Sequence, residues 1–107
     1  MPDPAILHHL EQVIAGRLSG DPASSYVARL HHRGPPVIAR KLGEEAVETV
    51  VAALSGSREE LVGEAADLVF HLLVLLSSRG VALDDVLSEL ARREGVSGLD
   101  EKAARSR

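Results

Sequence analysis

Cysteine and tryptophan are absent from this 107-residue chain, which has a single phenylalanine and a single tyrosine. Without cysteine the chain can form neither disulfide bonds nor thiolate metal sites, as suits a reducing compartment such as the cytoplasm. The apolar content of 45% therefore comes mostly from Ala, Val and Leu. Small cores without large aromatic anchors are often completed by a second subunit. We expect one domain over residues 1–107, with its core completed by dimerisation.

The chain also lacks an excess of positive charge, because 12 Lys and Arg are set against 16 Asp and Glu, a formal net charge of −4. A general nucleic-acid-binding surface requires a basic balance, so no nucleic-acid partner is expected. The most apolar stretch, Leu68 to Leu76, is interrupted by His71 and is too short to span a bilayer. We expect no secretory signal peptide, since the N-terminus is neither basic nor followed by a long apolar run. We expect a cytoplasmic protein with no membrane partner.

No segment alternates with period two for long enough to indicate a strand, whereas apolar residues recur at helical spacing. Capping and helix-breaking residues predict five helices, over residues 4–18, 25–30, 35–54, 58–79 and 83–93. The fourth begins with a capping box, Ser57 to Glu60. The remainder from Glu94 is polar, and we expect a flexible tail from about residue 100. The fold class is all-α, a helical bundle of about five helices.

The two central predicted helices, 35–54 and 58–79, are apolar around most of their circumference. The polar residues of the first share one sector roughly 100° wide and include Lys41, Glu44, Glu45 and Glu48. Those of the second share a strip roughly 60° wide and are Glu60, Glu64, Asp67 and His71. Helices that are apolar nearly all round are normally buried. Buried carboxylates are costly unless they are paired or bound to metal.

The short connection between these helices predicts antiparallel packing, which can bring Glu45 and Glu48 opposite Glu64 and Asp67. Four or five converging carboxylates repel one another strongly without a cation. Hard oxygen ligands and the lack of cysteine indicate Mg²⁺, or Mn²⁺, rather than zinc. Mg²⁺ held by carboxylates usually carries substrate phosphates. The predicted reaction is hydrolysis of a nucleotide phosphoanhydride by metal-activated water, with one carboxylate, not identified by the sequence, as general base.

Simpler interpretations exist for the same residues. Acidic residues on a helix usually face solvent, and Glu44 with Glu45 would be read that way if only one helix carried them. Glu60 is better interpreted as the capping-box residue. His71 is a hydrogen-bonded core histidine more readily than a metal ligand, and Lys41 either pairs with carboxylates or binds phosphate.

The spacing Glu45-x-x-Glu48, fifteen residues, then Glu64-x-x-Asp67 resembles the E-x-x-E…E-x-x-D signature of the all-α nucleoside triphosphate pyrophosphohydrolases, the MazG-like enzymes. Longer stretches resemble one family within them, the phosphoribosyl-ATP pyrophosphatases of histidine biosynthesis. The matching segments are residues 25–30, 41–50, 64–76 and 95–99, and the likeness extends from about residue 7 to residue 102.

The resemblance implies hydrolysis of phosphoribosyl-ATP to phosphoribosyl-AMP and pyrophosphate by a Mg²⁺-dependent homodimer. It implies that the metal and catalytic carboxylates are Glu44, Glu45, Glu48, Glu64 and Asp67. It also implies contacts with substrate phosphates or ribose from Tyr26, Arg29, Arg33 and Lys41. Pro35-Pro36 departs from the family pattern just after Arg33, while Arg29 keeps the charge of a more usual lysine.

Two alternatives stay open at this point. A related enzyme that removes pyrophosphate from another nucleotide, such as a house-cleaning hydrolase, would carry the same E-x-x-E…E-x-x-D pattern. A non-enzymatic helical dimer would carry the acidic strips as a solvated or salt-bridged face. The segments at residues 25–30 and 95–99 favour the histidine-pathway substrate over the first alternative.

Overall fold

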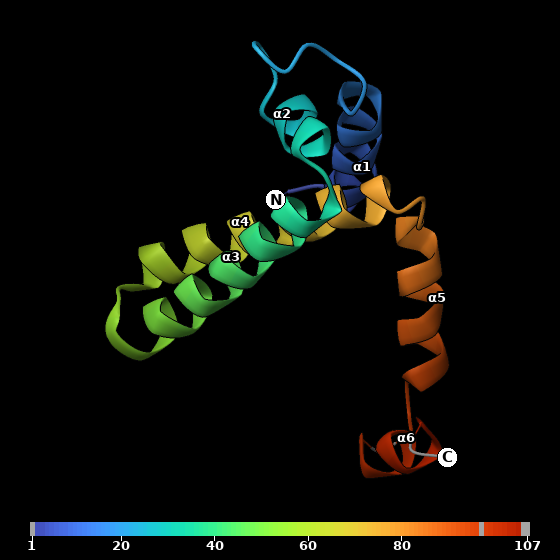
Figure 1. The fold of residues 1–107 in the computed structure, drawn as a ribbon. Coiled ribbons are helices and arrows are strands. Elements are labelled where there is room, and N and C mark those ends of the chain that lie inside the picture. The colour runs from blue at the N-terminus through green and yellow to red at the C-terminus, as the bar shows by residue number, and fades with distance from the viewer. Residues whose placement is uncertain (1, 97, 106–107) are drawn as a thin grey trace.

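The structure, a computed structural model, describes residues 2–96 and 98–105, leaving aside the side chain of residue 101. The described residues form six helices and no strand, which confirms the all-α class (Figure 1). The helices are α1 (Ile6–Arg17), α2 (Tyr26–Arg33), α3 (Pro35–Ser55), α4 (Arg58–Ser78), α5 (Leu83–Arg93) and α6 (Gly98–Arg105).

Capping residues set the boundaries of the middle helices much as the sequence predicts. The Ser25 hydroxyl accepts the backbone N–H of Ala28 at the start of α2. At the start of α4 the Ser57 hydroxyl accepts the N–H of Glu60, which is one half of the predicted capping box. Gly34 separates α2 from α3 with φ = 98°, a left-handed value that a residue with a Cβ rarely adopts. Its conformation lets α3 begin directly at Pro35, a position that tolerates proline.

The two ends of the chain differ from the prediction. Helix α1 begins at Ile6 rather than at Pro4, because the Asp3 carboxylate accepts the Ala5 N–H and caps a turn that precedes the helix. The prediction of an all-α bundle of about five helices is confirmed, with one further helix, α6, where only a polar remainder was expected. Residues 99–105 are mostly good helix formers, and the glycines flanking them concealed this preference. The flexible tail from about residue 100 stays a prediction, and residues 106–107 lie outside the described part.

Helices α3 and α4 form a long antiparallel hairpin that projects from the rest of the chain (Figure 1). At its base α1 packs against α4 and α2 packs against α3. Helices α5 and α6 leave this base in another direction (Figure 1). The core lies where α1 to α4 and the first residue of α5 meet, and its buried apolar residues are Ile14, Val27, Leu30, Ile38, Leu73, Val74 and Leu83.

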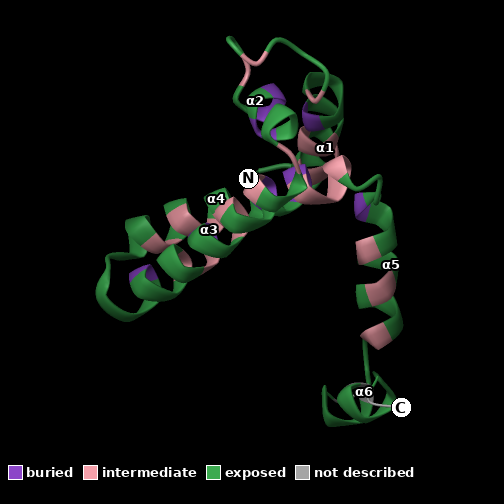
Figure 2. Cartoon of the chain, viewed as in Figure 1, coloured by how far each residue is buried: buried purple, intermediate pink, exposed green. Residues whose placement is uncertain are grey.

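The expectation that α3 and α4 are buried nearly all round is wrong for the single chain. Most of the hairpin beyond its base is exposed (Figure 2). Leu54 is 83% exposed and Val47 63% exposed. The reason is topological, since α1 and α2 are short and reach only the base of the hairpin. Large exposed apolar patches on proteins commonly mark interaction surfaces. Six exposed apolar side chains of the hairpin, named here the hairpin apolar face, are Val47, Val50, Val51, Leu54, Val62 and Val69.

Helix α4 is long and apolar enough to cross a membrane by length and composition alone, with a mean hydropathy of 1.6. This is weak support for a membrane span, because core helices of soluble proteins pass the same test. Glu64 and Asp67 lie in the middle of α4, and charged groups are expensive inside a bilayer. The absence of a membrane partner therefore stays our expectation.

The burial pattern of α1 yields a stability prediction from two isoleucines in one helix. Ile14 is fully buried, whereas Ile6 is 56% exposed. Ile14→Ala should lower the free energy of unfolding by about 2–5 kcal/mol, because it removes buried methyl groups and leaves a cavity. Ile6→Ala should cost less than about 1 kcal/mol. Urea unfolding at one protein concentration measures both, and equal losses would show that the core does not lie where α1 meets α4.

Candidate active site

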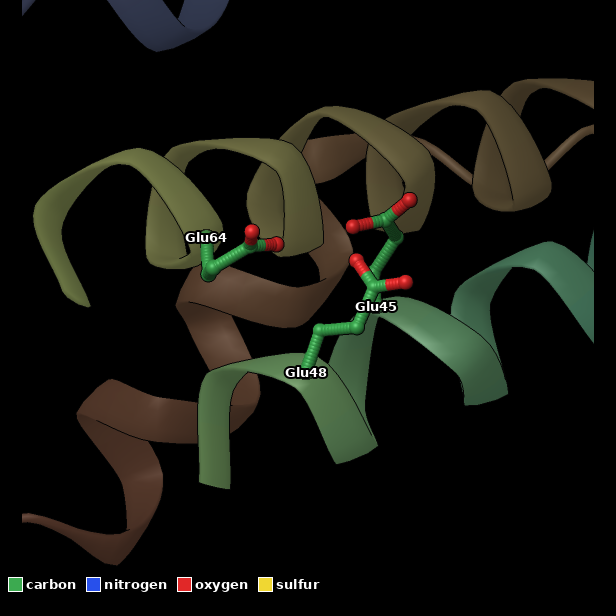
Figure 3. Close-up of side chains that lie close together, drawn as sticks. All are labelled: Glu45, Glu48 and Glu64. Atoms are coloured by element: carbon green, nitrogen blue, oxygen red, sulfur yellow. The ribbon is translucent and has the colours of Figure 1, made fainter. Parts of the chain in front are cut away.

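Three glutamate side chains converge between the two long helices of the hairpin. Glu45 and Glu48 extend from α3 and Glu64 extends from α4, with their carboxylates turned toward one another (Figure 3). One carboxylate oxygen of each lies within 4.8 Å of the others. This group is called the carboxylate cluster below. The antiparallel pairing predicted from the short connection therefore brings together three of the five acidic residues.

Helical spacing explains why these side chains face inward. Ile38, Glu45 and Ala52, seven residues apart, are the buried residues of α3 and lie along one face of that helix. On α4, Glu64 is likewise seven residues before the buried His71. The Thr49 hydroxyl donates to the Glu45 carbonyl at 2.8 Å, so a polar side chain of α3 stays within its own helix. Glu45 and Glu64 thus occupy positions that would otherwise hold apolar core residues, whereas Glu48 is exposed.

Two oxygens of the cluster have no hydrogen-bond partner within the described residues. They are Oε2 of Glu45 and Oε2 of Glu64, and both are buried. A buried carboxylate oxygen without a partner is costly, and in native proteins such an atom usually marks an absent water or ion. Converging oxygens of this kind are the ligands that a hard divalent cation prefers. The residues present therefore fit a bound Mg²⁺ or Mn²⁺.

The pKa values of two glutamates in the cluster are raised, as expected for carboxylates that face one another without a cation. Burial raises the pKa of Glu45, and the adjacent Glu48 carboxylate raises it further, against a smaller lowering by His71. For Glu64 the largest cause is a hydrogen bond with Glu48, followed by burial, and both raise its pKa. A raised pKa means that the ionised form is unfavourable where the group lies. A cation or a shared proton would relieve the cost.

The other two predicted carboxylates lie outside the cluster. Asp67 is exposed one turn after Glu64, and its charge raises the pKa of both Glu45 and Glu64. Glu44 is exposed and forms ion pairs at 3.7 Å with Arg40 and 3.5 Å with Lys41. Asp67 therefore lies beside the cluster, whereas Glu44 faces the basic residues of its own helix.

The predicted substrate-binding cations lie on α2 and α3. Lys41 Nζ is 4.0 Å from Glu45 Oε1, so this ammonium group reaches both Glu44 and the edge of the cluster. Tyr26 and Glu44 raise the pKa of Lys41, which keeps it charged at neutral pH. Arg29 donates its Nε–H to the Pro22 carbonyl at 3.1 Å, which fixes the plane of its guanidinium. Arg33 is exposed in the last turn of α2.

His71 is a hydrogen-bonded core histidine, which confirms the more conservative of its two interpretations. It is buried, its Nδ1 is 2.7 Å from the Asp67 carbonyl and its Nε2 is 2.8 Å from the Tyr26 hydroxyl. The sequence suggests only the first of these contacts, because four residues separate His71 from Asp67. No spacing rule connects residues 26 and 71, so the contact with Tyr26 depends on the fold.

A cleft of about 270 Å³ opens beside the cluster, on the side of the hairpin turn. Glu48 and Glu64 line it together with apolar side chains of α3, so it gives external access to the carboxylates. The sequence did not predict this cleft. Its lining residues are Val47, Glu48, Val51, Ala52, Ser55, Gly56, Glu60 and Glu64.

Comparison with known proteins gives consistent matches over nearly the whole chain. The model of the phosphoribosyl-ATP pyrophosphohydrolase family matches residues 7–94, which include every candidate site residue. The phosphoribosyl-ATP pyrophosphatase of Erythrobacter litoralis is 69% identical over 99 residues, covering 92% of this chain and 95% of that protein. That of Novosphingobium aromaticivorans is 62% identical over 101 residues, covering 94% of each. That of Rhizorhabdus wittichii is 63% identical over 99 residues, covering 92% of this chain and 93% of its own length.

The raised pKa values of Glu45 and Glu64 predict a pH dependence of stability in the absence of divalent metal. A carboxyl whose pKa is raised above the ordinary 4.5 stabilises the fold while it is protonated. That contribution is complete below pH 4.5 and is lost as the pH rises through the raised values. The thermal midpoint in EDTA should therefore fall from pH 5 to pH 7.5, more steeply in the wild type than in Glu64→Gln. Mg²⁺ at pH 7.5 should restore stability in the wild type.

Glu59→Gln is the matched control, because Glu59 is an exposed glutamate of α4 away from the cluster. Glu89 does not contribute to the difference, since hydrogen bonds from Arg92 and Arg93 lower its pKa to about 2 and keep it ionised over this range. If the thermal midpoint of wild type and of Glu64→Gln changed identically with pH, and Mg²⁺ raised neither, the carboxylate cluster would not be a cation site.

Proposed function

The chain belongs to the phosphoribosyl-ATP pyrophosphohydrolase family, and from this premise we propose that it hydrolyses phosphoribosyl-ATP to phosphoribosyl-AMP and pyrophosphate. This is the second step of histidine biosynthesis, and a cytoplasmic location is consistent with it. The observation that carries the proposal is the carboxylate cluster with its two unpartnered buried oxygens. The identity to proteins named phosphoribosyl-ATP pyrophosphatase favours this substrate over that of a general nucleotide hydrolase.

The proposed cofactor is Mg²⁺, with Mn²⁺ as a substitute of similar ligand preference. Glu45, Glu48 and Glu64 would hold it, with Asp67 beside them and Glu44 as a more distant candidate. When bound, the ion neutralises phosphate oxygens and lowers the pKa of a coordinated water. The oxygen-only ligand set and the buried orphan oxygens support this choice of ion.

The chain's own residues have distinct proposed roles in the hydrolysis. A water oxygen forms a bond to phosphorus while the bond from phosphorus to the pyrophosphate oxygen breaks. Glu48 and Glu64 line the cleft, so one of them accepts the proton that the water loses. Glu45 is too buried to meet the substrate directly and serves the cation instead.

Positive charge for the substrate phosphates is proposed to come from the α2 side of the site. Lys41 lies at the edge of the cluster and stays protonated, so it can neutralise a phosphate without leaving its helix. Arg29 and Arg33 lie on α2, whose C-terminus is joined to α3 through Gly34 alone. Together these cations would balance a substrate that carries many negative charges.

A homodimer is proposed to cover the hairpin apolar face. This surface consists of aliphatic side chains on adjacent helices, and obligate dimer interfaces have that composition. A second copy supplies the same face, which makes a two-fold pairing of hairpins self-complementary. Val47 and Val51 belong both to this face and to the cleft wall, so the partner hairpin would lie close to the substrate.

Purified protein with Mg²⁺ should release pyrophosphate from phosphoribosyl-ATP. Glu48→Gln and Asp67→Asn should each reduce kcat by roughly 100-fold or more, since each removes a carboxylate that would hold the cation or accept the proton of the attacking water. A coupled pyrophosphate assay measures this, and Glu59→Gln should retain wild-type rates. Equal cleavage of ordinary nucleoside triphosphates with no turnover of phosphoribosyl-ATP would favour the house-cleaning alternative. No hydrolysis of any nucleotide would favour the non-enzymatic dimer.

The oligomeric state tests the role of the hairpin apolar face. Sedimentation velocity should give about twice the 11.4 kDa mass of one chain. Val50→Glu places a charge on this face outside the cleft and should shift the protein toward the monomer. Gln12→Glu adds the same charge on the exposed side of α1 and should leave the dimer intact. A wild type that is monomeric at micromolar concentration would contradict the proposal.

A further inference from the structure

The chain's only Tyr and only Phe lie together at the border between α2 and α4. Tyr26 stacks on Phe70 with ring centroids 6.3 Å apart and an interplanar angle of 23°. The His71 ring meets both rings edge-on, at 5.8 Å from Tyr26 and 5.3 Å from Phe70. The rings of Phe70 and His71 hold the side chain of Tyr26 in one orientation while leaving the residue 44% exposed. A tyrosine fixed in this way can present its oxygen to a ligand at low entropic cost.

Hydrogen bonding at His71 decides which way the Tyr26 hydroxyl points. The Asp67 carbonyl can only accept, so His71 Nδ1 carries a hydrogen and donates it. In the neutral ring Nε2 is then an acceptor, because the bond at one nitrogen fixes the state of the other. The Tyr26 hydroxyl therefore donates its single hydrogen to His71 Nε2. Its oxygen keeps only lone pairs for any further partner.

This oxygen lies at the edge of the proposed substrate site. Burial raises the pKa of Tyr26, Lys41 lowers it, and the carboxylates of Glu45 and Asp67 raise it. The hydroxyl is also connected through His71 to the backbone of Asp67, one turn after Glu64 of the carboxylate cluster. An oxygen that offers only lone pairs here repels phosphate, which is itself an acceptor. It attracts a hydrogen-bond donor such as a sugar hydroxyl.

We propose that His71 is a positioning residue that orients the Tyr26 hydroxyl as an acceptor, so that Tyr26 recognises a ribose hydroxyl of the substrate rather than a phosphate. The inference rests on the proposed function and narrows the role of Tyr26 from "phosphates or ribose" to ribose. His71 itself touches neither metal nor substrate, because both of its nitrogens are engaged by Asp67 and Tyr26.

Two substitutions at His71 separate its two hydrogen bonds. In His71→Gln the amide oxygen can take the place of Nε2 and accept the Tyr26 hydrogen. In His71→Asn the amide nitrogen can replace Nδ1 and donate to the Asp67 carbonyl, but Tyr26 loses its acceptor. His71→Asn should raise KM for phosphoribosyl-ATP about tenfold, the value of one hydrogen bond, with a smaller effect on kcat. His71→Gln should restore most of the affinity.

Tyr26→Phe supplies the coupling test. If His71 acts through the Tyr26 hydroxyl, the KM of Tyr26→Phe/His71→Asn should equal that of Tyr26→Phe alone. If His71 is purely structural, the increases in KM caused by Tyr26→Phe and by His71→Asn should multiply in the double variant. His71→Asn and His71→Gln should then also raise KM equally. His31→Asn is the matched control, since His31 is an exposed histidine of α2 outside the ring group, and its KM should stay at the wild-type value.

Nitrogen-15 NMR of the wild-type histidine rings keeps the inference testable if the His71 variants fold poorly. His71 should show a protonated Nδ1 and an unprotonated Nε2 at neutral pH. A protonated Nε2, an unchanged KM in folded His71→Asn, or multiplied effects in the double variant would each overturn the inference. A wild type without phosphoribosyl-ATP turnover would contradict the proposed function, while the ring tautomer would still decide the direction of the Tyr26 hydroxyl.

Discussion

Mutual repulsion of three carboxylates between α3 and α4 is the constraint on which the rest of this molecule depends. Glu45 and Glu64 lie on the inner surface of the hairpin, where apolar side chains would otherwise hold two helices together, while the exposed Glu48 lines the adjoining cleft. The apolar core is accordingly concentrated at the hairpin base, where α1 and α2 cover it. We propose that a cation bound there offsets this electrostatic cost and converts the repulsion into affinity.

The same constraint accounts for the distribution of the remaining side chains. The aliphatic residues of the hairpin that cannot meet across the cluster point outward and form the hairpin apolar face. The only two large aromatic side chains, Tyr26 and Phe70, stack on each other between α2 and α4, where Phe70 packs against the core. Rigid rings next to a charged site hold α2 and its cations in place without adding negative charge. The core, the proposed dimer surface and the proposed substrate site therefore lie next to one another on the hairpin of α3 and α4.

Particular residues show how far the sequence could be read. The caps at Ser25 and Ser57 are local, so their hydrogen bonds were predictable from spacing. Glu44 and Glu45 lie at the two edges of one polar sector of α3, about 100° apart. The sequence could not say that the first would turn to Lys41 and the second inward. Helix α6 was not predicted because Gly95 and Gly98, at and just before its start, indicate a loop more strongly than the following residues indicate a helix. The exposure of the hairpin was not predicted because a pattern of apolar residues on a helix does not say which part of the chain, or which other molecule, covers them.

The sequence by itself determined the all-α class, most helix boundaries and the identity of the acidic residues, because these depend on interactions within a few turns of one helix. Only the tertiary structure decided which carboxylates meet, that two of their oxygens lack partners, and that Tyr26 and His71 share a hydrogen bond. Those outcomes depend on the rotation of α2, α3 and α4 about their own axes. That rotation is set by packing at the hairpin base, between residues far apart in the chain.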